Sequence, residues 1–369
     1  MPKSQEAAGP LAAPGSGHAW DAATFRDGIE QALLDFVDRQ SSWLTGLGED
    51  AARLVEHARV GVSGGKRLRA AFCWWGHLAV AAPEDAEALL RACASLELLH
   101  ASALVHDDVM DASDVRRGRP ATHRAFEALH REQQWSAGAE QYGAAAAILL
   151  GDLLLSWSDE LLRNCGLPAS RVLSALTYFD LTRSEVVTGQ FLDVSAQARG
   201  TSDVDVAMTV LRYKSAKYSV ERPLHIGAAL AGAGSATMTE LSRFGLPLGE
   251  AFQLRDDLLG VFGDPEETGK PAGDDLSEGK RTVLVALALD ALGPADRARL
   301  DGALGMPLGD DQVAELRDLI DRSGAHEQVE QVIEALTERA LGALDEADVR
   351  DEARPVLRQL AAAATQRTV

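Results

Sequence analysis

Three aspartates lie within five residues at the end of an apolar stretch: Asp107, Asp108 and Asp111. If this stretch is helical, Asp107 and Asp111 are four residues apart and point to the same side of the helix. Two anions on one helix face repel each other, so a cation is expected between them. Two converging carboxylates with no cysteine nearby provide the oxygen ligands that Mg²⁺ prefers. A solvated acidic helix end has the same local pattern, and this cluster alone leaves both interpretations open.

A second acidic pair favours the metal site. Asp256 and Asp257 lie in another apolar, helix-like stretch, three residues after Gln253. Two such pairs in matching contexts indicate a shared site. Basic residues surround both pairs along the chain: Lys66, Arg69, Arg116, Arg117, Lys214, Lys270 and Lys280. Carboxylates that hold Mg²⁺, opposed by lysines and arginines, predict a site for a diphosphate, because the ion and the guanidinium groups neutralise the same oxygens.

The composition limits the class of protein. With 369 residues, of which 46% are hydrophobic, the chain can bury a large core. Only 5% of the residues are aromatic and runs of β-branched residues are few, which disfavours a β-sheet protein. The formal net charge of -20 argues against a nucleic-acid partner, because such proteins need a positive surface. An anionic small substrate must therefore be held by local cations and metal, against the net field.

Cysteine use and hydropathy predict a cytoplasmic protein. Cys73, Cys93 and Cys165 have no metal-binding or redox spacing, and we expect them to be small core residues in a reducing compartment. The N-terminus has no basic segment followed by an apolar one, so we expect no signal peptide. The most apolar window, residues 144–155, is too short to cross a membrane and contains Asp152. We therefore expect no integral membrane segment.

The elements that must position these side chains all have helical patterns. Residues 1–18 are rich in Ala, Pro and Gly and are expected to form a disordered tail before a single domain over residues 19–369. Apolar residues then recur at spacings of three and four. Helical patterns cover residues 86–111, 139–163, 171–194, 208–230, 239–261, 283–292, 310–321 and 327–347. No strand alternation and no repeat is present, so the predicted fold is a single all-α bundle.

Three local features bear on the site. Two glycines break the first helical region, and the pattern predicts that Lys66 opens a new helix with Arg69 on the same face. Positive charge at a helix N-terminus opposes the macrodipole, which favours a bound anion there. Gly189 inside a helix predicts either a kink or a close approach of substrate. Residues 263–281 form a loop rich in Gly, Pro and Asp, of a length typical of a functional lid.

With these residues in hand, the sequence resembles the trans-isoprenyl diphosphate synthases, the polyprenyl synthetase family, and is most like its bacterial geranylgeranyl diphosphate synthases. The resemblance covers residues 25–365 and rests on seven motifs in family order. They are Gly64-Gly65-Lys66-Arg67-Leu68-Arg69, Glu97-Leu98-Leu99-His100 leading into His106-Asp107-Asp108-Val109-Met110-Asp111, Arg116-Arg117-Gly118-Arg119-Pro120, Thr188-Gly189-Gln190, Lys214-Ser215, Phe252-Gln253-Leu254-Arg255-Asp256-Asp257, and Thr268-Gly269-Lys270 with Asp274-Asp275-Leu276-Ser277-Glu278-Gly279-Lys280-Arg281-Thr282.

The resemblance implies an isoprenoid synthase-type helical bundle with a central cavity, usually a homodimer. It implies a prenyltransferase that condenses isopentenyl diphosphate head-to-tail with an allylic diphosphate (dimethylallyl, geranyl or farnesyl), using two or three Mg²⁺ ions. By resemblance, the metal ligands would be Asp107, Asp111 and Asp256, and the catalytic set would add Asp108, Lys214 and Asp257. The allylic substrate would be held by Arg116, Lys214, Gln253 and Lys270, and isopentenyl diphosphate by Lys66, Arg69, His100 and Arg117, with Ser215 and Lys280 also binding substrate.

The sequence departs from the family pattern at two positions. Ser215 stands where the family commonly has Thr, which keeps the hydroxyl. Gly260 replaces the last Asp of the second acidic motif. This leaves Asp256, with Asp257 or Asp264, as the candidate ligands of a third ion.

Product length can be argued from the helix that carries the first acidic cluster. The growing tail is expected to run from the aspartates toward the helix N-terminus, past Ala103 and Leu99. By resemblance, short-chain family members place an aromatic side chain at the positions that are Ser102 and Ala103 here. These small residues predict a product beyond C15, with C20 geranylgeranyl diphosphate first and a chain of C25 or above as the alternative.

Two rival functions remain open on the sequence. A class I terpene cyclase also uses Mg²⁺ in a helical cavity, but it normally carries an Asn or Asp, Ser or Thr, and Glu triad on its second wall. A non-catalytic subunit of a synthase typically loses aspartates from the first motif, which is complete here. Analysis of the products would separate all three.

Overall fold

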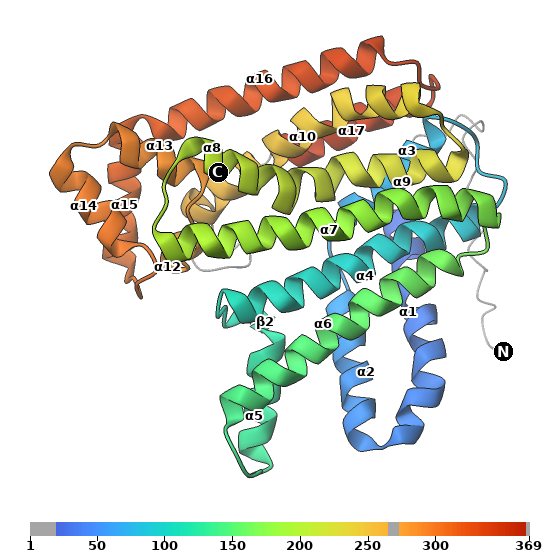
Figure 1. Cartoon of the computed structure of the whole chain (residues 1–369), viewed down its shortest axis with the longest axis horizontal. Helices are drawn as coiled ribbons and strands as arrows, with labels where there is room; N and C mark the ends of the chain where they lie inside the picture. The colour runs from blue at the N-terminus through green and yellow to red at the C-terminus, as the bar shows by residue number, and fades with distance from the viewer. Residues whose placement is uncertain (1–19, 265–272, 367–369) are drawn as a thin grey trace, which may run out of the picture.

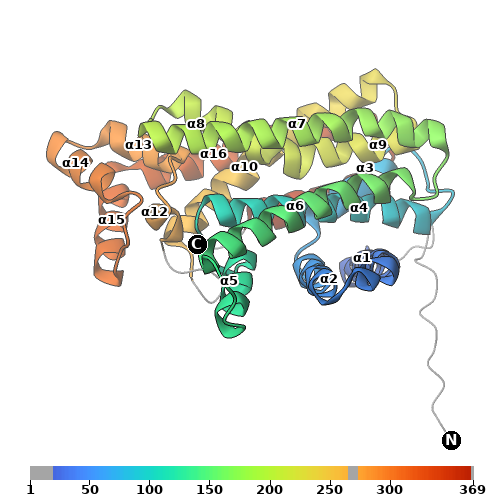
Figure 2. The ribbon, with the colours of Figure 1, turned by 60° about the horizontal axis from the view of Figure 1, so that its bottom comes forward.

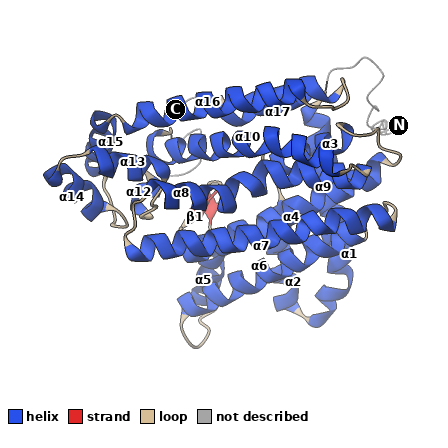
Figure 3. Cartoon of the chain, turned by 45° about the horizontal axis from the view of Figure 1, so that its top comes forward, coloured by secondary structure: helices blue, strands red, loops and turns tan. Residues whose placement is uncertain are grey.

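The computed structural model describes residues 20–264 and 273–366. They form a bundle of helices, as the sequence predicts, with one short β-hairpin (Figure 1 and Figure 3). The helices are α1 (Ala22–Leu44), η1 (Thr45–Leu47), α2 (Glu49–Val62), α3 (Leu68–Leu78), α4 (Ala86–Met110), α5 (Thr122–Glu132), α6 (Ala139–Arg163), α7 (Ala169–Arg199), α8 (Val204–Val210), η2 (Leu211–Glu221), α9 (Arg222–Ala231), α10 (Ser235–Phe262), α12 (Asp274–Ser277), α13 (Val283–Ala291), α14 (Pro294–Ala303), α15 (Asp310–Ser323), α16 (Ala325–Glu346) and α17 (Ala353–Thr365). The predicted tail over residues 1–18 and Lys270 lie outside the described residues.

Long helices packed in pairs form the body of the molecule. Helix α4 packs along α6, α7 along η2 and α9, and α10 along α16. Figure 2 shows the α1–α2 pair and α5 on the side of α4 and α6 that faces away from α7. The body therefore supports long helix faces between which a site can form.

The apolar core has two clusters, and helices η2, α10 and α16 contribute to both. The larger cluster includes Leu96, Leu154 and Phe244, and the smaller cluster includes Leu254 and Leu284. Helix α10 contributes its first half to the larger cluster and its second half to the smaller one. Helix α10 thus ties the C-terminal helices to the rest of the bundle.

Helix α4 is buried in this bundle. Ala86–Met110 is long and apolar enough to cross a membrane, but 78% of its apolar 18-residue window is buried inside the protein. Its N-terminus is capped by Asp85, whose side chain accepts from the N–H of Ala88. The apolar faces of α4 pack against neighbouring helices, and its C-terminal turn carries the first acidic cluster.

The helix predicted to open at Lys66 begins two residues later, so that prediction is wrong in detail. Arg67 has a left-handed backbone (φ 55°) and its buried guanidinium binds the carbonyl of Val62 at 2.6 Å. The first turn of α3 is capped by a residue of α4, since Glu97 Oε1 accepts from the N–H of Ala70 at 3.2 Å. The anion at this N-terminus is therefore a carboxylate of the protein itself.

Two further segments have a structure that the sequence patterns did not predict. The basic motif Arg116–Pro120 lies in strands β1 (Val115–Arg116) and β2 (Arg119–Pro120), which pair antiparallel. The helical pattern over residues 208–230, which Pro223 interrupts, lies in three consecutive segments, α8, η2 and α9.

The middle segment, η2, is a π-helix of 11 residues that ends just before Pro223. In an α-helix the ring of Pro223 would clash with the carbonyl of Ser219, and proline has no N–H to donate. The wider π turn moves that carbonyl away: the N–H of Arg222 bonds to Lys217, five residues earlier. The proline therefore favours the wide helix on which Lys214 lies.

Candidate active site

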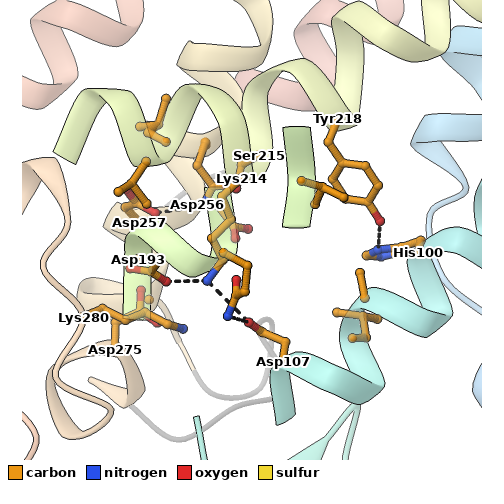
Figure 4. A pocket seen from close by; sticks show the side chains of 18 of the residues that line it. His100, Asp107, Asp193, Lys214, Ser215, Tyr218, Asp256, Asp257, Asp275 and Lys280 are labelled. Carbon is orange, nitrogen blue, oxygen red and sulfur yellow. Dashed lines mark hydrogen bonds and ion pairs between the residues drawn. The ribbon is translucent and has the colours of Figure 1, made fainter. Parts of the chain in front are cut away.

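One cavity of about 1180 Å³ joins the two acidic clusters. Its lining includes Asp107 from α4 and Asp256 from α10, so these carboxylates face one space (Figure 4). Most of the predicted site residues line it: Lys66, Arg69, His100, Ala103, Asp107, Arg116, Arg117, Lys214, Ser215, Gln253, Asp256, Asp257 and Lys280. Asp108, Asp111, Leu99 and Ser102 are not among its lining residues.

Asp107 is the centre of the first wall. Its Oδ1 accepts from Gln190 Nε2 at 2.9 Å and lies 3.4 Å from Lys214 Nζ, while Oδ2 lies 3.8 Å from Arg116. Burial raises the pKa of Asp107, but Lys214, Lys280 and Arg116 outweigh it, so the net shift is downward. Asp107 is therefore a carboxylate held between cations.

Asp108 does not line the cavity, but it positions a cation that does. It is buried, and its Oδ1 accepts from Nε of Arg116 at 2.8 Å and also from a terminal nitrogen of the same guanidinium. Such a two-point contact fixes the plane of the guanidinium. Asp108 thus holds Arg116 beside Asp107, and its predicted catalytic role is indirect in this geometry.

Asp111 caps the end of α4 and contacts Lys280 from the opposite side of the cavity. The two groups are 3.8 Å apart. Asp111 Oδ2 is buried and makes no hydrogen bond in the described part of the chain. Burial raises the pKa of Asp111 to about 7, with Asp107 and Glu278 adding to it. A buried carboxylate oxygen with no donor among the described residues is suited to bind a metal ion.

The second wall is built by α10 and α12. Gln253 Nε2 donates to Asp257 Oδ1 at 2.8 Å, one helical turn away, and Asp256 reaches the cavity. Burial raises the pKa of Asp257, and the carboxylates of Asp275 and Asp256 add to this. Asp275 itself accepts from Lys280 Nζ at 2.9 Å.

Lys214 and Lys280 link the acids of both walls. Lys214 Nζ donates to Asp193 of α7 at 2.6 Å and faces Asp107 (Figure 4). Burial lowers the pKa of each lysine, but the surrounding carboxylates outweigh it and raise both values. Both lysines therefore remain charged throughout the physiological range.

A second group of cations lies beside His100. The Arg69 guanidinium stacks over the Tyr218 ring at 4.3 Å and donates to Ser219 at 2.8 Å, and Tyr218 shares a 2.9 Å hydrogen bond with Nδ1 of His100. Burial and the nearby arginines hold the pKa of His100 well below its usual value, so the ring is neutral. Burial and Arg67 also lower the pKa of Arg117. A bound anion would relieve this crowding of positive charge.

Two glycines fix the position of Lys214. A Cβ atom at Gly189 of α7 would lie 2.3 Å from the backbone nitrogen of Lys214, and one at Gly249 of α10 would lie 2.4 Å from the carbonyl oxygen of Ala216. Neither position can carry a side chain without moving η2. The structure therefore corrects the interpretation of Gly189: the backbone of Lys214, rather than substrate, makes the close approach.

The donor set suits Mg²⁺, although the carboxylates now contact cations. The acids of both walls offer only oxygen, and Asp111 Oδ2 has no hydrogen-bond donor in the part of the chain that the structure describes. Among the described residues, no three His, Cys, Asp or Glu side chains lie close enough to hold an ion as they stand. Binding of an ion would thus require Lys214, Lys280 and Arg116 to turn from the carboxylates toward an incoming anion.

The apolar end of the cavity lies among α4, α6 and α7. Ala103, Ile148 and Val187 line it, whereas Ser102 and Leu99 are buried in the core outside the lining. The roles predicted for Ser102 and Leu99 in setting product length stay predictions.

Several residues of the site were not among the predicted site residues. Asp193 contacts the predicted site residue Lys214, and Tyr218 contacts the predicted site residue His100. Asp275 and Glu278 both contact Lys280. Asp275 and Glu278 lie inside a motif that carries the family resemblance, and Asp193 follows Gln190 by three residues. Their closeness in sequence to predicted site residues could therefore have identified them. No sequence signal identified Tyr218.

Known proteins are similar to this chain in sequence and in fold. The family model described as Polyprenyl synthetase matches residues 52–322. A geranylfarnesyl diphosphate synthase of Aeropyrum pernix is 32% identical over 317 residues, which are 85% of this chain and 90% of that protein. A geranylgeranyl diphosphate synthase of Sulfolobus acidocaldarius is 34% identical over 66% of this chain and 68% of that protein. The crystal structure of geranylgeranyl pyrophosphate synthase from Corynebacterium glutamicum, complexed with isoprenyl diphosphate and magnesium, has a TM-score of 0.92 at 41% identity and covers 95% of this chain and 100% of that chain.

Proposed function

The chain belongs to the polyprenyl synthetase family, and we propose that this trans-polyprenyl diphosphate synthase condenses isopentenyl diphosphate with an allylic diphosphate in a Mg²⁺-dependent reaction, with geranylgeranyl diphosphate (C20) as its main product. The observation that carries the proposal is the single cavity lined by both Asp107 and Asp256, with cations around them and apolar side chains beyond. Such a cavity can hold a charged head group at one end and a hydrocarbon tail at the other.

The charged residues would act on the departing diphosphate. When bound, Mg²⁺ would be held by Asp107, Asp111 and Asp256 and would supply Lewis-acid stabilisation of the leaving group. Arg116 and Lys214, already beside Asp107, would donate to the diphosphate oxygens. The C–O bond breaks with its electron pair on the diphosphate, and these cations stabilise the negative charge that grows there.

The second diphosphate has its own cations. Lys66, Arg69 and Arg117 would hold isopentenyl diphosphate near His100. Its double bond attacks the allylic carbon, and the proton then lost can pass to the released diphosphate. Apolar walls such as Leu104 and Val186 exclude water, which would otherwise capture the allylic cation as an alcohol.

The C20 product is supported by the small side chain of Ala103 in the cavity lining. The relatives do not decide the length, since those named above make products of different lengths by name. The alternative is a product of C25 or above.

Product analysis tests the proposed function. The purified chain is incubated with isopentenyl diphosphate and dimethylallyl, geranyl or farnesyl diphosphate, with Mg²⁺ or with EDTA, and the dephosphorylated products are sized by chromatography. We expect geranylgeraniol from each primer, and none in EDTA. A cyclised hydrocarbon formed from the allylic diphosphate alone would identify a terpene cyclase. No conversion at all would indicate a non-catalytic subunit.

We also expect a cytoplasmic homodimer. Helices α6 and α7 expose large apolar side chains, among them Leu149, Leu173, Val187 and Phe191. Val187 and Phe191 also line the cavity, although they are 63% and 68% exposed. A second copy packed on this face would cover apolar surface and close the side of the cavity. The three cysteines are free and buried, as expected in a reducing compartment.

Light scattering after size exclusion tests the dimer. Wild-type protein should have twice the mass of the chain, and Leu149→Glu with Phe191→Glu should give the monomer mass. Leu47→Glu, at a position 71% exposed on η1 and away from this face, is the control and should remain dimeric. A monomeric wild type would contradict the proposed dimer.

A further inference from the structure

A glycine stands where the second acidic cluster would carry its last carboxylate. Gly260 follows Asp256 by four residues on α10, the same spacing as Asp107 and Asp111 in the first cluster. A Cβ atom at Gly260 would lie 1.9 Å from Oδ2 and 2.4 Å from Cγ of Asp275. Both distances are far shorter than van der Waals contact. The carboxyl group of Asp275 therefore occupies the space that a side chain at position 260 would fill.

The fold brings Asp275 to this place from another element. Gly273, with φ 72°, starts the short helix α12, and Asp275 is its second residue. The side chain of Asp275 is buried, and its Oδ1 accepts from Lys280 Nζ at 2.9 Å. Figure 4 shows Asp275 and Lys280 together on the side of the cavity that carries Asp256 and Asp257.

Lys280 connects this carboxylate with the end of the first cluster. Its Nζ lies 3.8 Å from Asp111 Oδ2, so one amine faces carboxylates of both walls. The Asp111 side chain is only 3% exposed, and Oδ2 accepts no hydrogen bond in the described part of the chain. A buried carboxylate oxygen without a donor indicates that a ligand completes its surroundings, and between acids that ligand is a cation.

We propose that Asp275 supplies the carboxylate missing at position 260 and, with Asp256, holds a divalent cation on the second wall of the cavity, opposite Asp111. Gly260 is then required, because any side chain there would displace Asp275. When the ion binds Asp275, Lys280 is released to donate to a diphosphate oxygen. This inference rests on the proposed function, because it assigns residues to the ion that the function requires.

Calorimetric titration of the full chain with Mn²⁺, in the presence of inorganic pyrophosphate, tests the assignment. Asp275→Asn keeps the shape of the side chain and should weaken Mn²⁺ binding at least tenfold. Asp290→Asn removes one negative charge at an exposed position of α13 and should leave the affinity within twofold. Wild-type Mn²⁺ affinity in Asp275→Asn would overturn the inference.

Gly260→Ala provides an independent variant. Alanine forms helices better than glycine, so this change harms folding only if its Cβ meets a neighbour. Gly260→Ala should weaken Mn²⁺ binding as Asp275→Ala does. The double variant should bind Mn²⁺ as tightly as Asp275→Ala alone. Independent losses that multiply in the double variant would show that Gly260 does not act through Asp275 and would contradict the inference. Circular dichroism confirms folding.

A metal-free titration separates an effect on the ion from an effect on Lys280. With EDTA, Asp275→Asn should bind pyrophosphate within twofold of the wild type. A loss of metal-free pyrophosphate binding equal to the loss of Mn²⁺ binding would mean that Asp275 only positions Lys280, and would overturn the proposal. If the wild type itself binds no Mn²⁺ with pyrophosphate, the proposed function fails rather than this assignment.

Discussion

At the scale of single residues, the site is a set of acids and bases that neutralise each other. Asp107 lies between Lys214 and Arg116, and Lys280 lies between Asp275 and Asp111. Because each lysine faces several carboxylates, its pKa is raised and it keeps its charge. When a metal ion and a diphosphate bind, the carboxylates pair with the ion and the basic side chains pair with the diphosphate. No buried charge is left unpaired, which limits the desolvation cost.

Ala103 tests the path of the hydrocarbon tail. Ala103→Phe places a ring in the cavity four residues before Asp107 and should shorten the main product by at least one isoprene unit, as measured by chromatography of dephosphorylated products. We expect total turnover to stay within about tenfold of wild type, since no charged group is touched. Ala103→Ser changes little volume and should keep the product length. An unchanged product from Ala103→Phe would show that the tail runs elsewhere.

At the scale of elements, the π-helix η2 is the part that aims the catalytic lysine. Lys214, Ser215 and Tyr218 reach the cavity from it. Its C-terminal end is held by the partly buried pair between Arg222, the first residue of α9, and Glu185 of α7, whose two contacts are both 2.7 Å. The backbone of η2 packs closely against Gly189 of α7 and Gly249 of α10, and this packing sets the distance between η2 and Asp107. The π-helix is thus held at three points, two on α7 and one on α10, and a small shift of η2 would move Lys214.

Gly189→Ala should disturb this packing. Its Cβ would lie 2.3 Å from the backbone nitrogen of Lys214, so η2 must move. The variant should lose about 1–3 kcal/mol of unfolding free energy by overpacking, despite the better helix propensity of alanine. Its kcat/KM should fall by roughly tenfold or more because Lys214 is displaced. Chemical denaturation and steady-state kinetics measure the two effects.

Gly342→Ala on α16 is the matched control. It is also a glycine inside a helix, but a Cβ there meets nothing within 4 Å. It should gain roughly 0.5–1 kcal/mol of stability and leave kcat/KM unchanged. Equal behaviour of the two variants would contradict the role given to Gly189.

The sequence predicted the helices well where one apolar period was sustained. The helix at residues 139–163 has the predicted limits, and Asp107 and Asp256 face one cavity as expected. The π-helix was missed because Pro223 can end, kink or widen a helix, and only the packing of neighbouring helices selects among these. The start of α3 was misplaced because Glu97, a residue of another helix, caps it.

The residues that contact Gly189 and Gly260 could not be predicted either, because they lie on other elements. A glycine in a helical pattern indicates that something lies close, but the sequence does not say what. In the structure the neighbours are the backbone of Lys214 and the carboxylate of Asp275, both distant along the chain. Pairwise contacts between separate elements carry this information, and single-sequence periodicity does not.

At the scale of the whole molecule, buried histidines make stability depend on pH. Burial lowers the pKa of His77 to about 4, and Arg171 acts in the same direction. The unfolded chain takes up a proton near pH 6.5, while the folded protein resists it down to about pH 4. The stability contributed by neutral His77 is therefore complete above the unfolded pKa and is lost as the pH falls through this window.

Comparison with His77→Gln isolates this effect from other titrating groups. The difference in unfolding free energy between wild type and variant should shrink below pH 6.5, by up to about 1.4 kcal/mol per pH unit. Urea denaturation at pH 7, 6 and 5 measures it. A difference that stays constant over this range would contradict the assignment of a neutral, buried His77.

The central claim is that two distant acidic clusters act on one metal–diphosphate group. The most direct test is a double-mutant cycle on kcat with Asp107→Ala and Asp256→Ala, using radiolabelled isopentenyl diphosphate and checking the fold by circular dichroism. Each single variant should lose on the order of 10³-fold, and the double variant should lose little more, because groups that act as one unit are not additive. Losses that multiply, to roughly 10⁶-fold, would show that the two clusters act independently and would contradict the account.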